Sequence, residues 1–198
     1  MEKDLSKGNK KQALIRSGLE LMTSNGYMSS NLENILKAVG VPKGSFYYYF
    51  KSKEDFGSEI LESYNGYFTE KIDKHLLNRN IDSPLERILA FSADAIDGMQ
   101  KYDFKRGCLI GEFMQETALL PDTYNTRIKD ILSNWEKRIA ACLSEAQEKK
   151  EIKPQLNCEE LSSFFWIGWE GAVSRAKLEK NKWPLDKFMQ NFLLFIKK

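Results

Sequence analysis

The side chains best suited to covalent chemistry in this sequence are its three cysteines, and Cys108 has the most activating surroundings. It follows two basic residues in the run KRGCLIG, at the start of a helix predicted over residues 107–120. A nearby positive charge and a helix N-terminus both stabilise a thiolate, which is the form of cysteine that reacts with electrophiles and oxidants. Cys108 is therefore a candidate redox or electrophile sensor. The alternative is a small buried packing residue.

The other candidates do not form a catalytic arrangement. Cys142 should be core, because it lies between apolar residues in the middle of a predicted helix, and Cys158 has two glutamates beside it, which oppose a thiolate. His75 is the only histidine, and we expect it at the surface near a helix C-terminus. The sequence has no glycine-rich phosphate loop, no metal-ligand cluster and no CxxC pair. We therefore predict no enzyme activity (the alternative being a thiol-dependent reductase), no cofactor, no metal and no disulfide framework.

A second group of functional side chains is aromatic and basic. Residues 41–56 read VPKGSFYYYFKSKEDF, in which three consecutive tyrosines lie between phenylalanines and lysines. At about 100° per residue, Phe46 and Phe50 share one side of a short helix and should be core, whereas Tyr47 and Tyr48 face away from them. A tyrosine beside DNA can cover the sugar and donate its hydroxyl to a phosphate.

The same stretch offers further groups for DNA. Gly44 lets the backbone approach the bases closely, and a lysine or serine can reach base edges or phosphates. Helix N-termini at Ser30 and Lys53 should favour a phosphate. The alternative is an aromatic-rich surface or a dimer contact. The candidate DNA contacts are Ser30, Lys43, Gly44, Ser45, Tyr47, Tyr48, Tyr49 and Lys53.

The elements that must position these residues are helices. Periodicity predicts a helix over 10–24, and a capping box starting at Ser30 begins a short helix that Gly40 ends. A second short helix from Pro42 to Phe50 then completes a helix-turn-helix, the arrangement that places its second helix in a major groove. A longer helix follows over about 53–77. The remaining helices are predicted over 84–101, 107–120, 121–150, 158–180 and from 184 onward, which makes an all-α protein of about nine helices.

Composition agrees with a globular helical protein. The 198 residues include only 12 glycines and 5 prolines, with 42% hydrophobic and 29% charged residues. We predict neither a signal peptide nor a membrane span, and we expect a cytoplasmic protein. Residues 1–53 hold nine basic against four acidic side chains, whereas the remainder holds 21 against 24. A basic head on a mildly acidic body is typical of a DNA-binding domain joined to another domain, although the difference is small enough to arise by chance.

The residues over about 10–67 resemble the DNA-binding domain of the TetR family of bacterial transcriptional regulators. The resemblance lies in Gly26-Tyr27, in Ser30 and in the run AVGVPKGSFYYYFKSKEDF. The chain departs at residues 34–37, Asn-Ile-Leu-Lys, where many members have Asp-Ile-Ala. The resemblance implies a DNA-binding head over 1–52, a connecting helix over 53–77 and an effector-binding, dimerising body over 53–198.

The resemblance also implies a function. A homodimer would bind double-stranded DNA at a near-palindromic operator, and a small-molecule effector of unknown identity would release it. Activation and repression share the same sequence pattern, and the resemblance favours a repressor. The Gly107-Cys108 pair, together with the head, is similar to the branch that includes repressors sensing N-ethylmaleimide-type electrophiles, which implies release by modification of Cys108. The alternative is a DNA-organising or division-control protein with the same head and no effector.

Two residue sets in the body follow from the apolar pattern and the resemblance. Small residues that recur every four positions let helices approach closely, which predicts a dimer surface on the last two helices; the alternative is core within one chain. The dimer set is Trp166, Gly168, Trp169, Ala172, Ala176, Phe188, Phe192 and Phe195. An effector pocket should be lined by apolar and aromatic residues, each of which also fits plain core. The pocket set is Phe91, Phe104, Phe113, Met114, Trp135 and Phe165.

Overall fold

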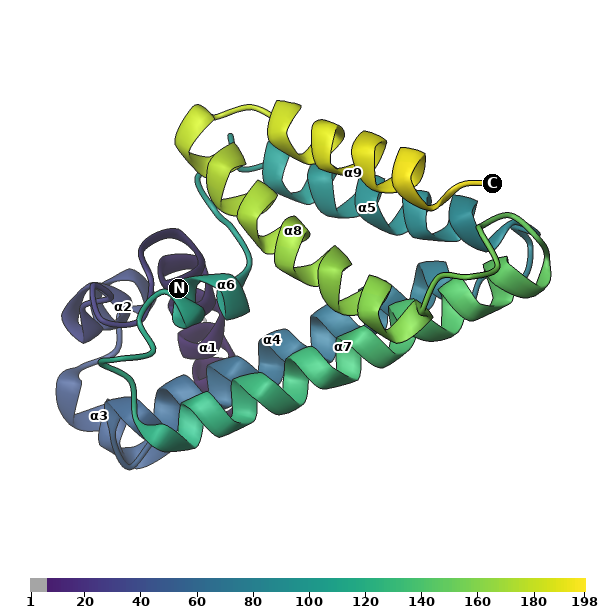
Figure 1. The fold of residues 1–198 in the computed structure, drawn as a ribbon. Helices are drawn as coiled ribbons and strands as arrows, with labels where there is room; N and C mark the ends of the chain where they lie inside the picture. Colours follow the sequence, from purple (N-terminus) through teal and green to yellow (C-terminus); the bar gives the residue numbers. More distant parts are fainter. Residues whose placement is uncertain (1–6) are drawn as a thin grey trace. The chain divides into compact units, whose positions relative to one another are not determined.

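The computed structural model describes residues 7–198, which form nine α-helices and, apart from one isolated bridge between Ile152 and Lys197, no β-structure (Figure 1). The all-α prediction and the number of helices are confirmed for this part of the chain. The helices are α1 Lys7–Asn25, α2 Leu32–Val39, α3 Lys43–Tyr49, α4 Lys53–Leu76, α5 Pro84–Gln100, α6 Leu109–Met114, α7 Asp122–Glu148, α8 Cys158–Glu179 and α9 Trp183–Ile196.

The chain folds into two compact units that do not follow one another along the sequence. The first comprises the described residues up to 66 together with residues 108–126, and the second comprises residues 67–107 and 127–198. Helices α4 and α7 pass from one unit into the other. The helix-turn-helix head therefore shares its unit with a segment from far along the chain. The functional division at residue 52 stays a prediction.

In the first unit, α1 packs on α2 and α2 on α3 (Figure 1). Gly26 and Gly40 follow α1 and α2 with φ of 78° and 68°, a left-handed conformation that only glycine adopts at little cost. The capping box expected at Ser30 is wrong by one residue. Asn31 caps α2 by accepting a hydrogen bond from Glu33 N at 2.8 Å, while Ser30 Oγ donates to the Gly26 carbonyl.

The helix expected over 107–120 is shorter than the prediction. α6 covers only Leu109–Met114, and the chain then runs through turns to residue 120. No proline or glycine separates Gly111 from Pro121, so local sequence alone favours one continuous helix. The reason for the early end is tertiary: Glu116, just past the helix, accepts hydrogen bonds from the backbone of the α1–α2 turn.

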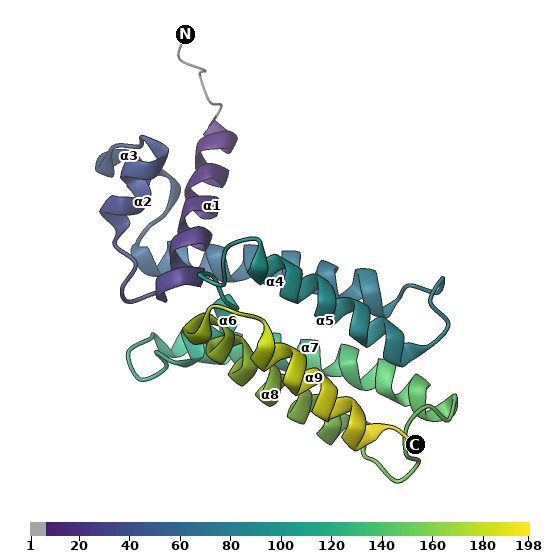
Figure 2. The same ribbon diagram turned by 90° about the horizontal axis from the view of Figure 1, so that it is seen from above.

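The second unit holds α5, α8, α9 and the larger part of α7. α8 and α9 run side by side in both views, and α9 also packs on α5 (Figures 1 and 2). The caps predicted at Ser83 and Asn157 are confirmed, because their side chains accept backbone hydrogen bonds at the starts of α5 and α8. Trp135 and Trp166, 5.1 Å apart between ring centroids, lie at the centre of the core.

No helix in the described part of the chain combines the length and the apolar character needed to cross a lipid bilayer.

Candidate nucleic-acid interface

Helix α3 has two chemically distinct sides, as the periodicity predicts. Phe46 and Phe50 are buried, with 0% and 1% of their surface exposed, and their rings pack on each other and on Phe56 at 4.7–5.3 Å. Tyr47 and Tyr48 are 56% and 64% exposed. The orientation inferred from the sequence is therefore confirmed. The two phenylalanines fix the helix, and the two tyrosines form an aromatic, hydroxyl-bearing surface.

The residues at the start of α3 continue this surface. A Cβ added at Gly44 would meet no other atom within 4 Å, so the backbone there is open to a partner. Lys43 and Ser45 are exposed, and the Lys43 ammonium lies 4.0 Å from the Glu33 carboxylate, a distance at which an exposed ion pair contributes little. Tyr49 is half-buried, with its ring 5.3 Å from that of Tyr48. The structure thus brings six of the eight candidate DNA contacts together on one helix.

Ser30 and Lys53 are engaged inside the first unit instead. Ser30 is buried and bonds to the Gly26 carbonyl. Lys53 Nζ donates to the Tyr27 carbonyl at 3.0 Å and lies 4.5 Å from the centre of the Tyr27 ring. Burial lowers the pKa of Lys53, and the charge of Glu116 partly offsets this. In this conformation both residues support the helix-turn-helix and neither presents its polar group with the α3 surface.

Sequence reasoning missed a cluster around Tyr27, which it used only as part of the Gly-Tyr family mark. The Tyr27 ring contacts Phe113 at 5.5 Å and Tyr124 at 5.4 Å, and its backbone N–H donates to Glu116 at 2.9 Å. Burial raises the pKa of Tyr27. These partners lie more than 80 residues away in sequence, and no local pattern connects them to the head.

None of the three cysteines, all of which lie in the described part of the chain, forms a disulfide, and their environments differ. Cys108 is the residue before α6 and is only 6% exposed. The two basic residues before it have other contacts: Lys105 pairs with Asp103 at 3.3 Å, and the Arg106 guanidinium lies 4.2 Å from the centre of the Tyr102 ring. The sensor role of Cys108 stays a prediction.

For the other two cysteines and the histidine, we compare the predicted position with the observed one. Cys142 is core as predicted, and burial raises its pKa to about 11. Cys158 is half-buried at the first position of α8. The surface position expected for His75 is wrong, because its side chain is only 15% exposed and its Nε2 lies 2.7 Å from Asp94 Oδ2. Burial alone would raise the pKa of Asp94, but hydrogen bonds from His75 and Lys71 hold it below the usual value.

The predicted effector-pocket residues fall into both units. Phe113 and Met114 belong to the first unit, and Phe91, Phe104, Trp135 and Phe165 belong to the second. Five of the six are buried and Met114 is half-buried. In the second unit the rings pack closely, and the Trp135 N–H donates to Thr69 Oγ1 at 3.2 Å. The neighbouring Trp166 N–H is also buried, and no hydrogen-bond partner for it is found in the described structure.

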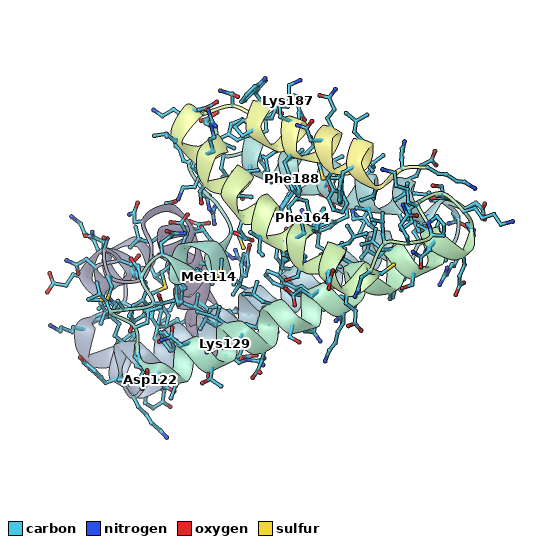
Figure 3. All side chains as sticks on the ribbon, in the orientation of Figure 1. Met114, Asp122, Lys129, Phe164, Lys187 and Phe188 are labelled. Atoms are coloured by element: carbon cyan, nitrogen blue, oxygen red, sulfur yellow. The ribbon has the colours of Figure 1, made fainter. Side chains whose placement is uncertain are left out.

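A groove of about 490 Å³ lies on the second unit between α8, α9 and the two residues that precede α8. It differs from the predicted pocket. Figure 3 labels Phe164 and Phe188, which line it from α8 and α9. Phe164, Phe195, Ile167 and Leu194 on the same two helices are 51–72% exposed. The lining residues are Leu156, Asn157, Glu160, Leu161, Phe164, Phe188, Asn191, Phe192 and Phe195.

The predicted dimer residues mostly face inward. Trp166, Trp169, Ala172, Ala176 and Phe192 are each at most 8% exposed within a single chain. They therefore pack α8 and α9 into the unit and have little surface left to cover a partner. A further member, Gly168, lies against Phe188, because an added Cβ would collide with that ring. Phe195, 54% exposed, is the member that faces solvent.

Comparison with known proteins places both parts of the chain. Residues 14–60 match the family model "Bacterial regulatory proteins, tetR family", and residues 84–192 match "Tetracyclin repressor-like, C-terminal domain". The chain is 43% identical over 181 residues to the transcriptional regulator AcuR of Cereibacter sphaeroides, covering 91% of this chain and 82% of that protein. It is 27% identical to the HTH-type transcriptional repressor NemR of Escherichia coli K12, covering 89% and 88%.

A solved structure shows the same fold. The crystal structure of the regulatory protein TetR from Rhodobacter sphaeroides matches with a TM-score of 0.91 and 42% identity, covering 93% of this chain and 97% of that chain. The family models together span the helix-turn-helix and most of the body, in agreement with the exposed tyrosine surface on α3. The chain therefore belongs to the TetR family of bacterial transcriptional regulators, which bind DNA.

Proposed function

We propose that this regulator is a repressor that holds a near-palindromic operator through α3 and releases it when an effector binds the body. The observation that carries the proposal is the two-sided α3, with buried Phe46 and Phe50 behind exposed Tyr47 and Tyr48. The tyrosine hydroxyls and Lys43 contact phosphates, and Gly44 and Ser45 approach the base edges. Ser30 and Lys53 act from behind this surface, because both are bonded within the unit.

The proposed dimer forms over the apolar groove of α8 and α9. Exposed apolar side chains in a contiguous patch are typical of a protein interface. Here Phe164 and Phe195 line a groove of about 490 Å³, and Ile167 and Leu194 on the same two helices are also exposed. A second copy of the chain offers the same apolar face, which suits the self-complementary contact of a two-fold dimer. Two heads related by this axis would bind half-sites about 34–36 Å apart or a multiple of that distance.

The proposed effector site lies in the second unit, near the buried Trp166. An unpaired N–H in an apolar core costs about 1–3 kcal/mol, and a bound acceptor would remove that cost. This supports an effector that combines an apolar part with a carbonyl or carboxylate oxygen. Modification of Cys108 is the other proposed route to release, and its low exposure means that modification requires local opening.

The names of the relatives bear on the choice between an effector-responsive repressor and a DNA-organising protein. Both curated relatives described above are named as transcriptional regulators or repressors, which does not favour a DNA-organising or division-control protein. An effector-responsive repressor is also the typical function in the family.

The decisive experiment is selection of bound duplexes from a random DNA pool by the reduced, full-length protein. We expect enrichment of one near-palindromic sequence, because two identical heads impose their symmetry on the site. A pool that stays random at low salt would contradict the proposal. With the operator in hand, N-ethylmaleimide should release the wild type but not Cys108→Ser if the thiol route operates. Equal release of both proteins would exclude Cys108, and Cys158→Ser is the matched control.

A further inference from the structure

The α1–α2 turn of the head is held by residues from another part of the chain. This turn, Gly26 to Met28, connects α1 to the helix-turn-helix. Glu116 Oε2 accepts hydrogen bonds from Tyr27 N at 2.9 Å and Met28 N at 3.1 Å. Lys53 Nζ donates to the Tyr27 carbonyl at 3.0 Å. The backbone of one turn is thus held by a carboxylate and an ammonium at the same time.

The Tyr27 side chain is enclosed as well. Its ring makes edge contacts with Phe113 from α6 and Tyr124 from α7, at 5.5 Å and 5.4 Å between centroids. Tyr124 is fixed in turn, because its hydroxyl donates to the Glu54 carbonyl at 2.5 Å. We name the four side chains around the turn the Tyr27 clamp: Lys53, Phe113, Glu116 and Tyr124.

Gly26 is part of this construction for two reasons. Its φ of 78° lies in the left-handed region, and an added Cβ would collide with the Glu116 carboxylate. A side chain at residue 26 would therefore strain the backbone and displace the carboxylate from its present position beside the two amide groups. Charge-assisted hydrogen bonds of this kind are about twice as strong as neutral ones, which suits Glu116 to fix a turn.

The clamp connects the head to the rest of the chain. Three of its members lie within residues 108–126, the segment that begins at Cys108 directly after the chain leaves the second unit. A shift of this segment would change the position of Tyr27. Because the turn at Tyr27 leads within a few residues into α2 and then α3, the orientation of these helices would change as well. The contacts lie inside one compact unit, so a local rearrangement is enough to alter them.

From these contacts we infer that Glu116 is a positioning residue for DNA binding: it fixes the α1–α2 turn so that α3 is presented in a DNA-competent orientation. The inference rests on the proposed function, since it concerns affinity for the operator. Loss of the clamp leaves α3 folded but less well oriented, so that part of the binding free energy is spent on ordering the head.

The test compares full-length variants at a temperature where thermal melts show each to be folded. Glu116→Ala should weaken operator binding about 10-fold, because two charge-assisted hydrogen bonds to the turn are lost. Glu116→Gln keeps one acceptor oxygen and should fall between Glu116→Ala and the wild type. Gln115→Ala, an exposed neighbour in the same turn, is the matched control and should bind normally.

A second readout separates positioning from simple stabilisation. Hydrogen exchange at the amides of Tyr27 and Met28 should be faster in Glu116→Ala, with exchange in α3 unchanged. A lower melting temperature with unchanged operator affinity would overturn the inference and leave Glu116 a structural residue. If Glu116→Ala does not fold, Glu116→Asp, whose carboxylate is withdrawn by one methylene, carries the same expectation. Absence of operator binding by the wild type would overturn the proposed function as well, whereas normal binding by folded Glu116→Ala overturns this inference alone.

Discussion

Helices α3 and α8 are both rich in aromatic residues, yet the sequence distinguishes the inner and outer faces of α3 much better than those of α8. Phe46 in α3 and Phe50, the residue directly after it, are buried, whereas the two outward tyrosines are exposed. In α8 the residues expected to face a partner, such as Trp169 and Ala172, are buried in their own chain, while Phe164 and Ile167 are exposed. The difference teaches that a periodic pattern identifies an inward face only when the opposite face is polar.

The physical reason lies in how many apolar faces each helix has. The outward face of α3 carries hydroxyl groups, so the two faces differ in chemistry. Apolar residues occur around most of α8, and a helix that is apolar on all sides is a buried helix. One face is covered by the core of the unit, and we propose that a second copy covers the other. Sequence alone does not rank two apolar faces.

The largest effect is expected from the buried side of α3. Phe50→Ala should lower the free energy of unfolding by about 3–5 kcal/mol, because a fully buried ring is replaced by a cavity. Chemical denaturation of the full-length protein measures this. The exposed Tyr47→Ala is the control and should cost well under 1 kcal/mol of stability. Similar losses in both variants would mean that α3 is not two-sided.

The next largest effect is expected on the exposed side of α8 and α9. Leu194→Asp places a charge on the apolar face of α9, which should weaken the dimer by about 2–4 kcal/mol. Light scattering across a concentration series gives the dissociation constant. Leu119→Asp, equally exposed but in the first unit, should leave the dimer intact. A Leu194→Asp protein that dimerises like the wild type would refute the proposed face.

Two glycines of α8 sharpen the comparison between its inner and outer faces. Gly168→Ala should cost about 1–3 kcal/mol of stability, because the new methyl group meets the Phe188 ring. Gly171→Ala meets no atom within 4 Å in the single chain and should stabilise α8 by roughly 0.5–1 kcal/mol. Thermal and denaturant unfolding provide the measurement. If Gly171→Ala instead weakens the dimer, Gly171 itself lies at the contact between copies.

The last prediction, also a small effect, concerns the outward side of α3. Tyr48→Phe should weaken operator binding by about 0.5–1.5 kcal/mol if the hydroxyl donates to a phosphate, and it should not change stability. Fluorescence anisotropy with the selected operator is sensitive enough to resolve this. Normal affinity in Tyr48→Phe would remove the phosphate role and leave the tyrosine ring as a purely apolar contact.

Much of the fold could be predicted because its signals are local. Gly26 and Gly40 end helices, Ser83 and Asn157 begin them, and each acts through hydrogen bonds or dihedral angles within a few residues. The exposed set on α3 could be predicted for the same reason. The cap of α2 was misplaced by one residue, since Ser30 and Asn31 are both good capping residues and only the structure shows which one accepts.

What could not be predicted depends on contacts between distant residues. The early end of α6, the engagement of Lys53 and the ion pair of His75 with Asp94 each join segments separated by 19 residues or more. The packing of Gly168 in α8 against Phe188 in α9 is of the same kind. A single sequence carries no local sign of such pairs, so the contacts of these residues cannot be predicted from it.

The composition of the first unit has a consequence for protein engineering. Regulators of this kind invite recombination, in which the reading head of one protein is fused to the sensing body of another. A junction placed after residue 52 would separate Tyr27 from Phe113, Glu116 and Tyr124. A transplanted head would then meet a foreign segment in place of residues 108–126. Functional hybrids should therefore exchange two separate stretches of sequence together, the head and residues 108–126.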